Sequence, residues 1–178
     1  MIQTAAALIA VAAALADSSS ARWPARAEAP IRVWVQPWSP AEEWETAYVV
    51  AARTAFREWN RLGLSLHFTF TSDSALAEVG VTWTDRFSAP MSGSTTTTLH
   101  DAGRIVHAEM LLAVHHPDGR RLDAEEVRVL ALHEIGHALG LEHSDDQHSV
   151  MARTVRVRGL SGRDRAAARR HYDASGRR

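Results

Sequence analysis

Residues 133–144 read HEIGHALGLEHS and carry the densest chemical signal in the chain. On a helix, His133 and His137 lie four residues apart, so both rings project from the same face, about one turn apart. This spacing lets two imidazoles reach one zinc ion at about 2.0–2.1 Å. Glu134 lies about a third of a turn further round and is placed to take a proton from a water bound to that metal. Zinc lowers the pKa of such a water to roughly 7, so a carboxylate base suffices at neutral pH.

A catalytic zinc needs a third protein ligand, and two sources compete. One is a glutamate on a later helix, but no glutamate occurs after Glu142, and a later aspartate such as Asp164 is a weak substitute. The other is a histidine six residues after the second, past a glycine that lets the helix end and the chain reverse. His143 and Gly140 occupy those positions, and glycine adopts a positive φ without penalty. We therefore predict His143 as the third ligand and Gly140 as the helix exit.

The full pattern HExxHxxGxxH fixes five positions, three of which are histidine, a rare residue type. The HExxH core alone is a weak signal, and the added glycine and histidine make it strong. For average residue usage, a chance match in a chain of this length has a probability of about one in ten thousand or less. A helix that merely carries surface histidines is therefore disfavoured.

The segment resembles the metzincins, and within that clan the matrixins, which are similar to the matrix metallopeptidases. Ser144 follows the third histidine, as it commonly does in matrixins. Met151 lies eight residues after His143 and corresponds to the Met-turn beneath the metal. The stretch LSGRDRAAARRHY resembles the closing helix of that fold. The motif match covers about residues 122–172, and the looser match of element order covers about residues 30–172.

The resemblance implies a zinc metalloendopeptidase, a hydrolase of peptide bonds with one catalytic Zn²⁺ on the three motif histidines. Glu134 would be the general base, and Met151 would be a structural floor that does not bind the metal. A protein or peptide substrate would lie in a cleft over the zinc and pair as an added strand with the edge strand, within residues 91–99. Two alternatives of other classes stay open: a zinc-binding module without turnover, and a zinc hydrolase of a non-peptide amide.

Two features depart from the animal members of that family. Matrixin zymogens are held latent by a propeptide cysteine, and this chain contains no cysteine, so latency by that route is excluded. After the Met-turn, animal members continue with a Pro-x-Tyr wall of the specificity pocket, whereas this chain reads ARTV at residues 152–155. Substrate preference therefore does not carry over.

A structural metal site is not readable from the sequence. Animal members bind a structural zinc through one aspartate and three histidines. Candidates occur in a similar region with a different spacing: His100, Asp101, His107, His115 and His116. His107 and His67 fall on the polar faces of their strands, and His148 could line the cleft. A structural zinc or calcium therefore stays unassigned.

The N-terminus predicts export. Residues 5–15 (AAALIAVAAAL) are apolar but too short for a permanent membrane span. They end in Ala14-Leu15-Ala16, the small-x-small pattern that signal peptidase cleaves, although no Lys or Arg precedes them. We predict a signal peptide at residues 1–16, a flexible lead-in at 17–30 and a peptidase domain at 31–174. The protein would be secreted or periplasmic, with no membrane attachment after cleavage; a buried alanine-rich helix is the alternative.

Residue patterns predict the remaining elements. Strands are expected at residues 31–35, 64–71 and 79–83, and a hairpin at 94–100 and 104–114 around a turn at 101–103. On the return strand one face is expected to hold Val106, Ala108, Met110, Leu112 and Val114. Ser39 and Pro40 predict the start of a long helix that ends at Gly63.

Two capping boxes, Asp123 with Glu126 and Ser161 with Asp164, predict two further helices. Strands with a few segregated helices predict an α+β (α/β layered) domain. Together with the resemblance, this order predicts a metzincin-like zinc peptidase domain. Its sheet would be twisted and mostly parallel with one antiparallel edge strand, joined by a long helix, an active-site helix and a C-terminal helix.

Length and composition exclude several classes. A chain of 178 residues suits one domain, and 46% hydrophobic with 23% charged residues is ordinary globular composition. The net charge of -1 gives no reason to expect nucleic acid.

Nine arginines against two aspartates give residues 152–178 a charge of +7 and the remainder -8. This predicts a solvated helix surface, with docking of an anionic partner as the alternative. A monomer is predicted.

Overall fold

The computed structural model describes residues 9–10, 21–24 and 29–173. The predicted signal peptide lies outside the described residues, apart from the short strand β1 (Ile9–Ala10), which pairs antiparallel with β7 (Thr154–Val155). Within the described part of the chain, no helix is both long enough and apolar enough to cross a membrane.

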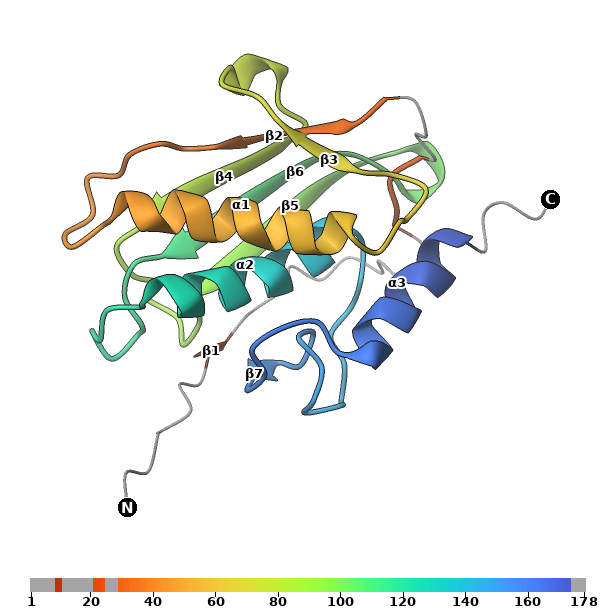
Figure 1. The fold of residues 1–178 in the computed structure, drawn as a ribbon. Coiled ribbons are helices and arrows are strands. Elements are labelled where there is room, and N and C mark those ends of the chain that lie inside the picture. Colours follow the sequence, from red (N-terminus) through yellow and green to blue (C-terminus); the bar gives the residue numbers. More distant parts are fainter. Residues whose placement is uncertain (1–8, 11–20, 25–28, 174–178) are drawn as a thin grey trace.

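A five-stranded sheet forms the back of the domain (Figure 1). Its strands are β2 (Ile31–Val35), β3 (Phe68–Phe70), β4 (Val79–Thr84), β5 (Gly93–His100) and β6 (Arg104–Ala113). The order is β3-β2-β4-β6-β5, and every pairing is parallel except that of β5 with β6. The predicted fold class, a mostly parallel sheet with one antiparallel edge strand, is confirmed.

Two helices cross one face of this sheet side by side, α1 (Thr46–Asn60) and α2 (Ala124–Ala138) (Figure 1). Short 3-10 turns lie at Ser74–Leu76 and Asp101–Gly103, and α3 (Gly162–Asp173) packs beyond the end of α2. The core lies between the sheet and the two helices. Trp59 and Tyr48 of α1 are buried there, and the polar atom of each side chain donates a hydrogen bond to a backbone carbonyl, which removes the cost of burying it. Trp59 Nε1 donates to Leu132 O at 3.0 Å and Tyr48 Oη to Leu122 O at 2.5 Å.

The long helix starts later than predicted. It begins at Thr46, and Ser39 closes only a short turn, accepting from the backbone N–H of Ala41 at 3.1 Å. Glu43 lies three residues after Pro40, in the first turn of the helix predicted to start there, but it has φ +56°, which is outside the right-handed helical region. Its carboxylate accepts instead from His115 Nε2 at 2.9 Å. The hydrogen bond between Glu43 and the distant His115 therefore stands in place of the first helical turn, which Ser39 and Pro40 predicted.

The prediction that Val106 shares the buried face of its strand was wrong, because Val106 is 42% exposed. Thr98 pairs with His107 and Leu99 with Ile105, so Val106 is an extra residue at a β-bulge. The bulge moves the buried position to Ile105, which is fully buried. β3 is also shorter than the predicted strand at residues 64–71.

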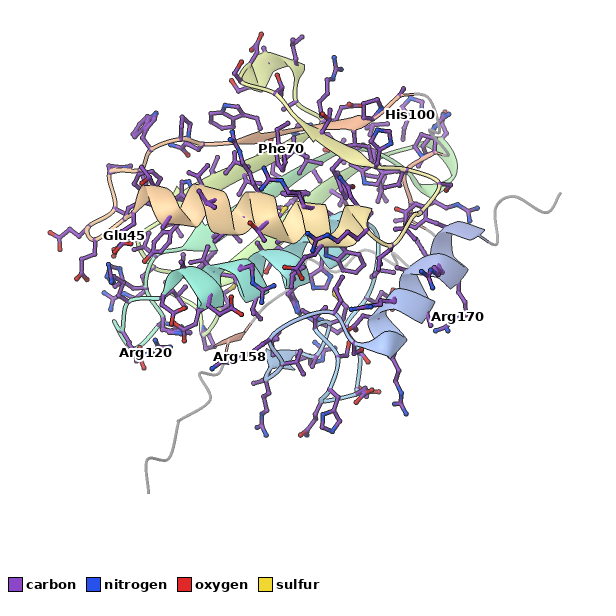
Figure 2. The ribbon with its side chains drawn as sticks, in the orientation of Figure 1. Glu45, Phe70, His100, Arg120, Arg158 and Arg170 are labelled. Atoms are coloured by element: carbon purple, nitrogen blue, oxygen red, sulfur yellow. The ribbon has the colours of Figure 1, made fainter. Side chains whose placement is uncertain are left out.

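His115 ties together three segments at one end of the domain. Its Nδ1 lies 2.9 Å from Asp85 Oδ1 and its Nε2 lies 2.9 Å from Glu43 Oε2, while 10% of the side chain is exposed. Both ring nitrogens can donate only when the imidazole is protonated. The hydrogen bond to Glu43, followed by that to Asp85, therefore raises the pKa of His115. The same end carries Glu45 and Arg120 (Figure 2).

We predict that this bridge makes stability pH-dependent. Because the pKa of His115 is higher in the folded than in the unfolded chain, its stabilisation is complete below about pH 6.5 and is lost as the pH rises through the folded value. Urea unfolding of wild type and His115→Gln should therefore differ most at pH 5.5 and converge by pH 8.5. His67→Gln, a change at an exposed histidine, is the control for the substitution itself. A difference that stays constant with pH would contradict the protonated bridge.

Candidate metal centre

The helix that carries the HExxH motif begins at the predicted capping box. Asp123 Oδ1 accepts from the backbone N–H of Glu126 at 2.8 Å, and Glu126 Oε2 accepts from that of Asp123 at 2.9 Å. This reciprocal pair satisfies two of the donors that a helix start leaves without partners. The start of α2 is therefore defined by its local sequence.

The end of α2 is a Schellman motif that turns the chain back. Leu141 N donates to Gly136 O at 2.9 Å, and Gly140 N donates to His137 O at 2.8 Å. Gly140 has φ +83°, in the left-handed region, and a Cβ there would overlap the carbonyl oxygen of Ala21. Glycine is thus required both by conformation and by space, and the reversal brings His143 back toward the helix.

Two aromatic side chains from distant segments complete this helix end. Trp23 Nε1 donates to Ala138 O at 2.8 Å, and Tyr172 Oη donates to Leu139 O at 2.7 Å. Together with the Schellman bonds, they satisfy the last carbonyl groups of α2. Trp23 is 1% exposed and lies within residues 17–30, which were expected to be a flexible lead-in. No short-range pattern signalled this contact, because Trp23 and Ala138 are 115 residues apart.

Backbone carbonyls fix the tautomers of the two helical histidines. His133 Nδ1 lies 2.6 Å from Val150 O, and His137 Nδ1 lies 2.9 Å from Leu141 O. A carbonyl oxygen can only accept, so Nδ1 carries the hydrogen in both rings. Each Nε2 is then left with a free lone pair. That is the form in which histidine binds a metal, with its other nitrogen held by a carbonyl.

The three predicted ligands converge. Nitrogen atoms of His133, His137 and His143 all lie within 4.8 Å of one another, and the two helical Nε2 atoms are 2.9 Å apart. Two lone pairs facing each other at this distance repel unless a cation lies between them. His143 Nε2 is buried and has no hydrogen-bond partner among the described residues. Burial, the largest cause in each case, lowers the pKa of all three rings, that of His137 to about 4, so they are neutral at pH 7. The arrangement fits a zinc ion.

The other histidines do not form a second site of this kind. Within the described residues, the three motif histidines are the only group of three or more His, Asp or Glu side chains arranged to hold a metal. His107 Nε2 contacts Glu109 Oε1 at 2.5 Å, and His116 Nδ1 contacts Ser92 Oγ at 3.2 Å. His100 and His148 are exposed.

Met151, the residue that the resemblance assigns to the Met-turn, is 3% exposed. It packs against Gly136, which lies in sequence between His133 and His137, and a Cβ at Gly136 would overlap the sulfur of Met151. A glycine inside a helical pattern signals such close packing, so this position could have been found from the sequence.

Asp164 anchors the turn that precedes Met151. Its carboxylate, 3% exposed, accepts from Val150 N at 3.1 Å, from Ser161 N at 2.7 Å and from the hydroxyl of Ser149. Val150 in turn accepts from His133 through its carbonyl oxygen. The sequence identified Asp164 as a helix cap and a weak alternative ligand. The structure shows in addition that Asp164 connects α3 to His133 through the two hydrogen bonds of the Val150 backbone.

Glu134 is completely buried between α2 and the edge strand β5. Its Oε2 accepts from the hydroxyl of Thr95 at 2.6 Å, and its Oε1 has no partner among the described residues. Burial raises the pKa of Glu134 to about 8, and the hydrogen bond from Thr95 acts in the opposite direction. A divalent cation on the neighbouring histidines would favour the carboxylate further, because opposite charges stabilise the ionised form.

The model of the matrixin family matches residues 32–173. The chain belongs to the matrixins. It is therefore a metalloendopeptidase of a zinc-dependent family, as the resemblance of residues 133–151 implied. The crystal structure of myroilysin has a similar fold, with a TM-score of 0.61 and 14% identity over 93% of this chain and 91% of that chain. No curated protein sequence matches the chain.

We predict that Gly136→Ala destabilises the matrixin domain and its metal site. Inside a helix this change should stabilise by about 1 kcal/mol, but here the methyl group overlaps Met151. Overpacking of this kind costs about 1–3 kcal/mol. Urea unfolding should show a net loss, and zinc retained after gel filtration should fall. Gly162→Ala is the control, since a Cβ there meets nothing within 4 Å. Unchanged stability and zinc content in Gly136→Ala would contradict the close packing.

Proposed function

We propose that this matrixin is a secreted or periplasmic zinc endopeptidase. His133, His137 and His143 would hold one catalytic zinc, with Glu134 as the general base. The observation that carries the proposal is the tautomer arrangement: both helical Nδ1 atoms face backbone carbonyls, at 2.6 and 2.9 Å, so two Nε2 lone pairs converge with His143. Such a set suits a cation that accepts nitrogen ligands and leaves a coordination position open.

Zinc bound there would lower the pKa of a water molecule to roughly 7 and polarise the scissile carbonyl. Glu134 would take a proton from that water and later give it to the leaving amine. Its unpartnered Oε1 is the atom free to do so, because Oε2 is already held by Thr95. Met151 would support the ligands from below without binding the metal, and Gly140 would set the reversal that delivers His143.

A protein or peptide substrate would bind along β5. This strand is at the edge of the sheet, with β6 on one side only. An extended peptide can add to such an edge through main-chain hydrogen bonds. Glu134 packs directly against the start of β5, so a peptide paired there would pass close to the base.

The decisive variant is Glu134→Ala. It should abolish hydrolysis of unfolded casein, with a loss of at least about 10³-fold, while zinc stays near one per chain, because the base is lost and the ligands remain. Metal analysis and a casein assay on the same preparation measure both. Activity that survives in Glu134→Ala would refute the mechanism. Bound zinc in wild type with no hydrolysis of any peptide library would favour a binding module, and hydrolysis of small amides alone would favour a non-peptide hydrolase.

Export requires removal of residues 1–16. The apolar stretch and the Ala14-Leu15-Ala16 pattern support cleavage after Ala16. N-terminal sequencing of the mature chain should therefore begin at Asp17. A mature chain that still begins at Met1 would contradict export by this route. Cleavage would also remove β1 and free the edge of β7.

A further inference from the structure

The hydroxyl of Thr95 contacts the buried carboxylate of Glu134. It lies 2.6 Å from Oε2 and 3.1 Å from the backbone carbonyl oxygen of Glu134. Thr95 is 7% exposed and Glu134 is fully buried, so water does not compete for this contact. A hydroxyl has one hydrogen to donate, and the contact with Oε2 is the shorter of the two.

Gly93 provides the space for this arrangement. It lies two residues before Thr95 on β5, and therefore on the same face of the strand. A Cβ at Gly93 would overlap Oε1 of Glu134 and come within 2.8 Å of a methyl group of Leu130. Any side chain at this position would therefore push the carboxylate away from β5. The strand thus leaves room for the carboxylate at one residue and holds it at another.

We infer that Thr95 is a positioning residue for Glu134, which it orients so that Oε2 is fixed and Oε1 is presented for proton transfer. This inference rests on the proposed role of Glu134 as general base. The observation behind it is that the two carboxylate oxygens of Glu134 differ in their contacts. Oε2 accepts a short hydrogen bond, and Oε1 has no partner in the described part of the chain.

The position of Thr95 also links the base to substrate binding. From Gly93 to Thr98, before the bulge, β5 pairs with β6 in an unbroken antiparallel register, in which Thr95 pairs with Met110 and Gly93 with Leu112. A peptide added to the outer edge of β5 would be in register with the strand that holds the carboxylate. Base and scissile bond are then positioned by one rigid element, which is what efficient proton transfer requires.

The test compares Thr95→Val, which removes the hydroxyl at nearly constant volume, with Thr95→Ser, which keeps it. A hydrogen bond to a charged group is worth enough to predict a fall in kcat of about 10- to 100-fold in Thr95→Val, with KM within about twofold. Thr95→Ser should restore kcat to within about threefold of wild type. Thr82→Val is the matched control, because Thr82 also lies in the sheet and its hydroxyl contacts Met110 O instead. Its kcat should not change.

Zinc content and the midpoint of urea unfolding are measured for each variant, so that loss of metal or of fold is seen separately from loss of rate. If Thr95→Val does not fold, Thr95→Ala and Thr95→Ser form the substitute pair, since both lack the methyl group and only serine keeps the hydroxyl. The inference is overturned if the hydroxyl-free variant keeps its kcat, if the change appears only in KM, or if Thr95→Ser is as impaired as Thr95→Val. Failure of the proposed function would be distinguishable from failure of this inference, because Glu134→Ala would then remain active.

Discussion

The proposed metal site depends on two hydrogen bonds that lie behind the candidate ligands, from His133 Nδ1 to Val150 O and from His137 Nδ1 to Leu141 O. A free imidazole exchanges its hydrogen between two nitrogens, and the wrong tautomer would place a donor where a metal needs a lone pair. Backbone carbonyls cannot donate, so they select one tautomer in both rings. The fold therefore holds both histidines in the tautomer that the proposed metal requires.

The acceptors are themselves held by the fold. Leu141 belongs to the Schellman turn around Gly140, and the end of α2 is completed by Trp23 and Tyr172 from opposite ends of the domain. Val150 is held from behind by Asp164 at the start of α3. The segment before β2 and the last helix thus support the same helix end. A change in either segment should therefore affect the candidate ligands, although neither segment contributes an atom to the proposed site.

The sequence predicted the features that depend on local rules. The histidine spacing, both capping boxes, the alternating strands and the glycine at the helix exit each concern residues only a few positions apart. They were enough to predict the family and the fold class. Long-range features were missed. The start of α1 depends on contact between Glu43 and His115, and the burial of Ile105 in place of Val106 depends on register with β5.

The supporting residues of the site were missed for the same physical reason. Thr95 and Glu134 are 39 residues apart, and Trp23 and Ala138 are 115 apart, so only the assembled fold brings each pair together. Asp164 was recognised as a helix cap because that bond is local, whereas its bond to Val150 is not. Sequence patterns therefore identified the candidate ligands and base, but not the groups that hold them in place.

Zinc anomalous scattering from crystals of the mature chain tests the central claim most directly. We expect one strong peak bonded to Nε2 of His133, His137 and His143, with both helical Nδ1 atoms still facing the carbonyls of Val150 and Leu141. Zinc bound through an Nδ1 atom, or a peak away from these three histidines, would contradict it.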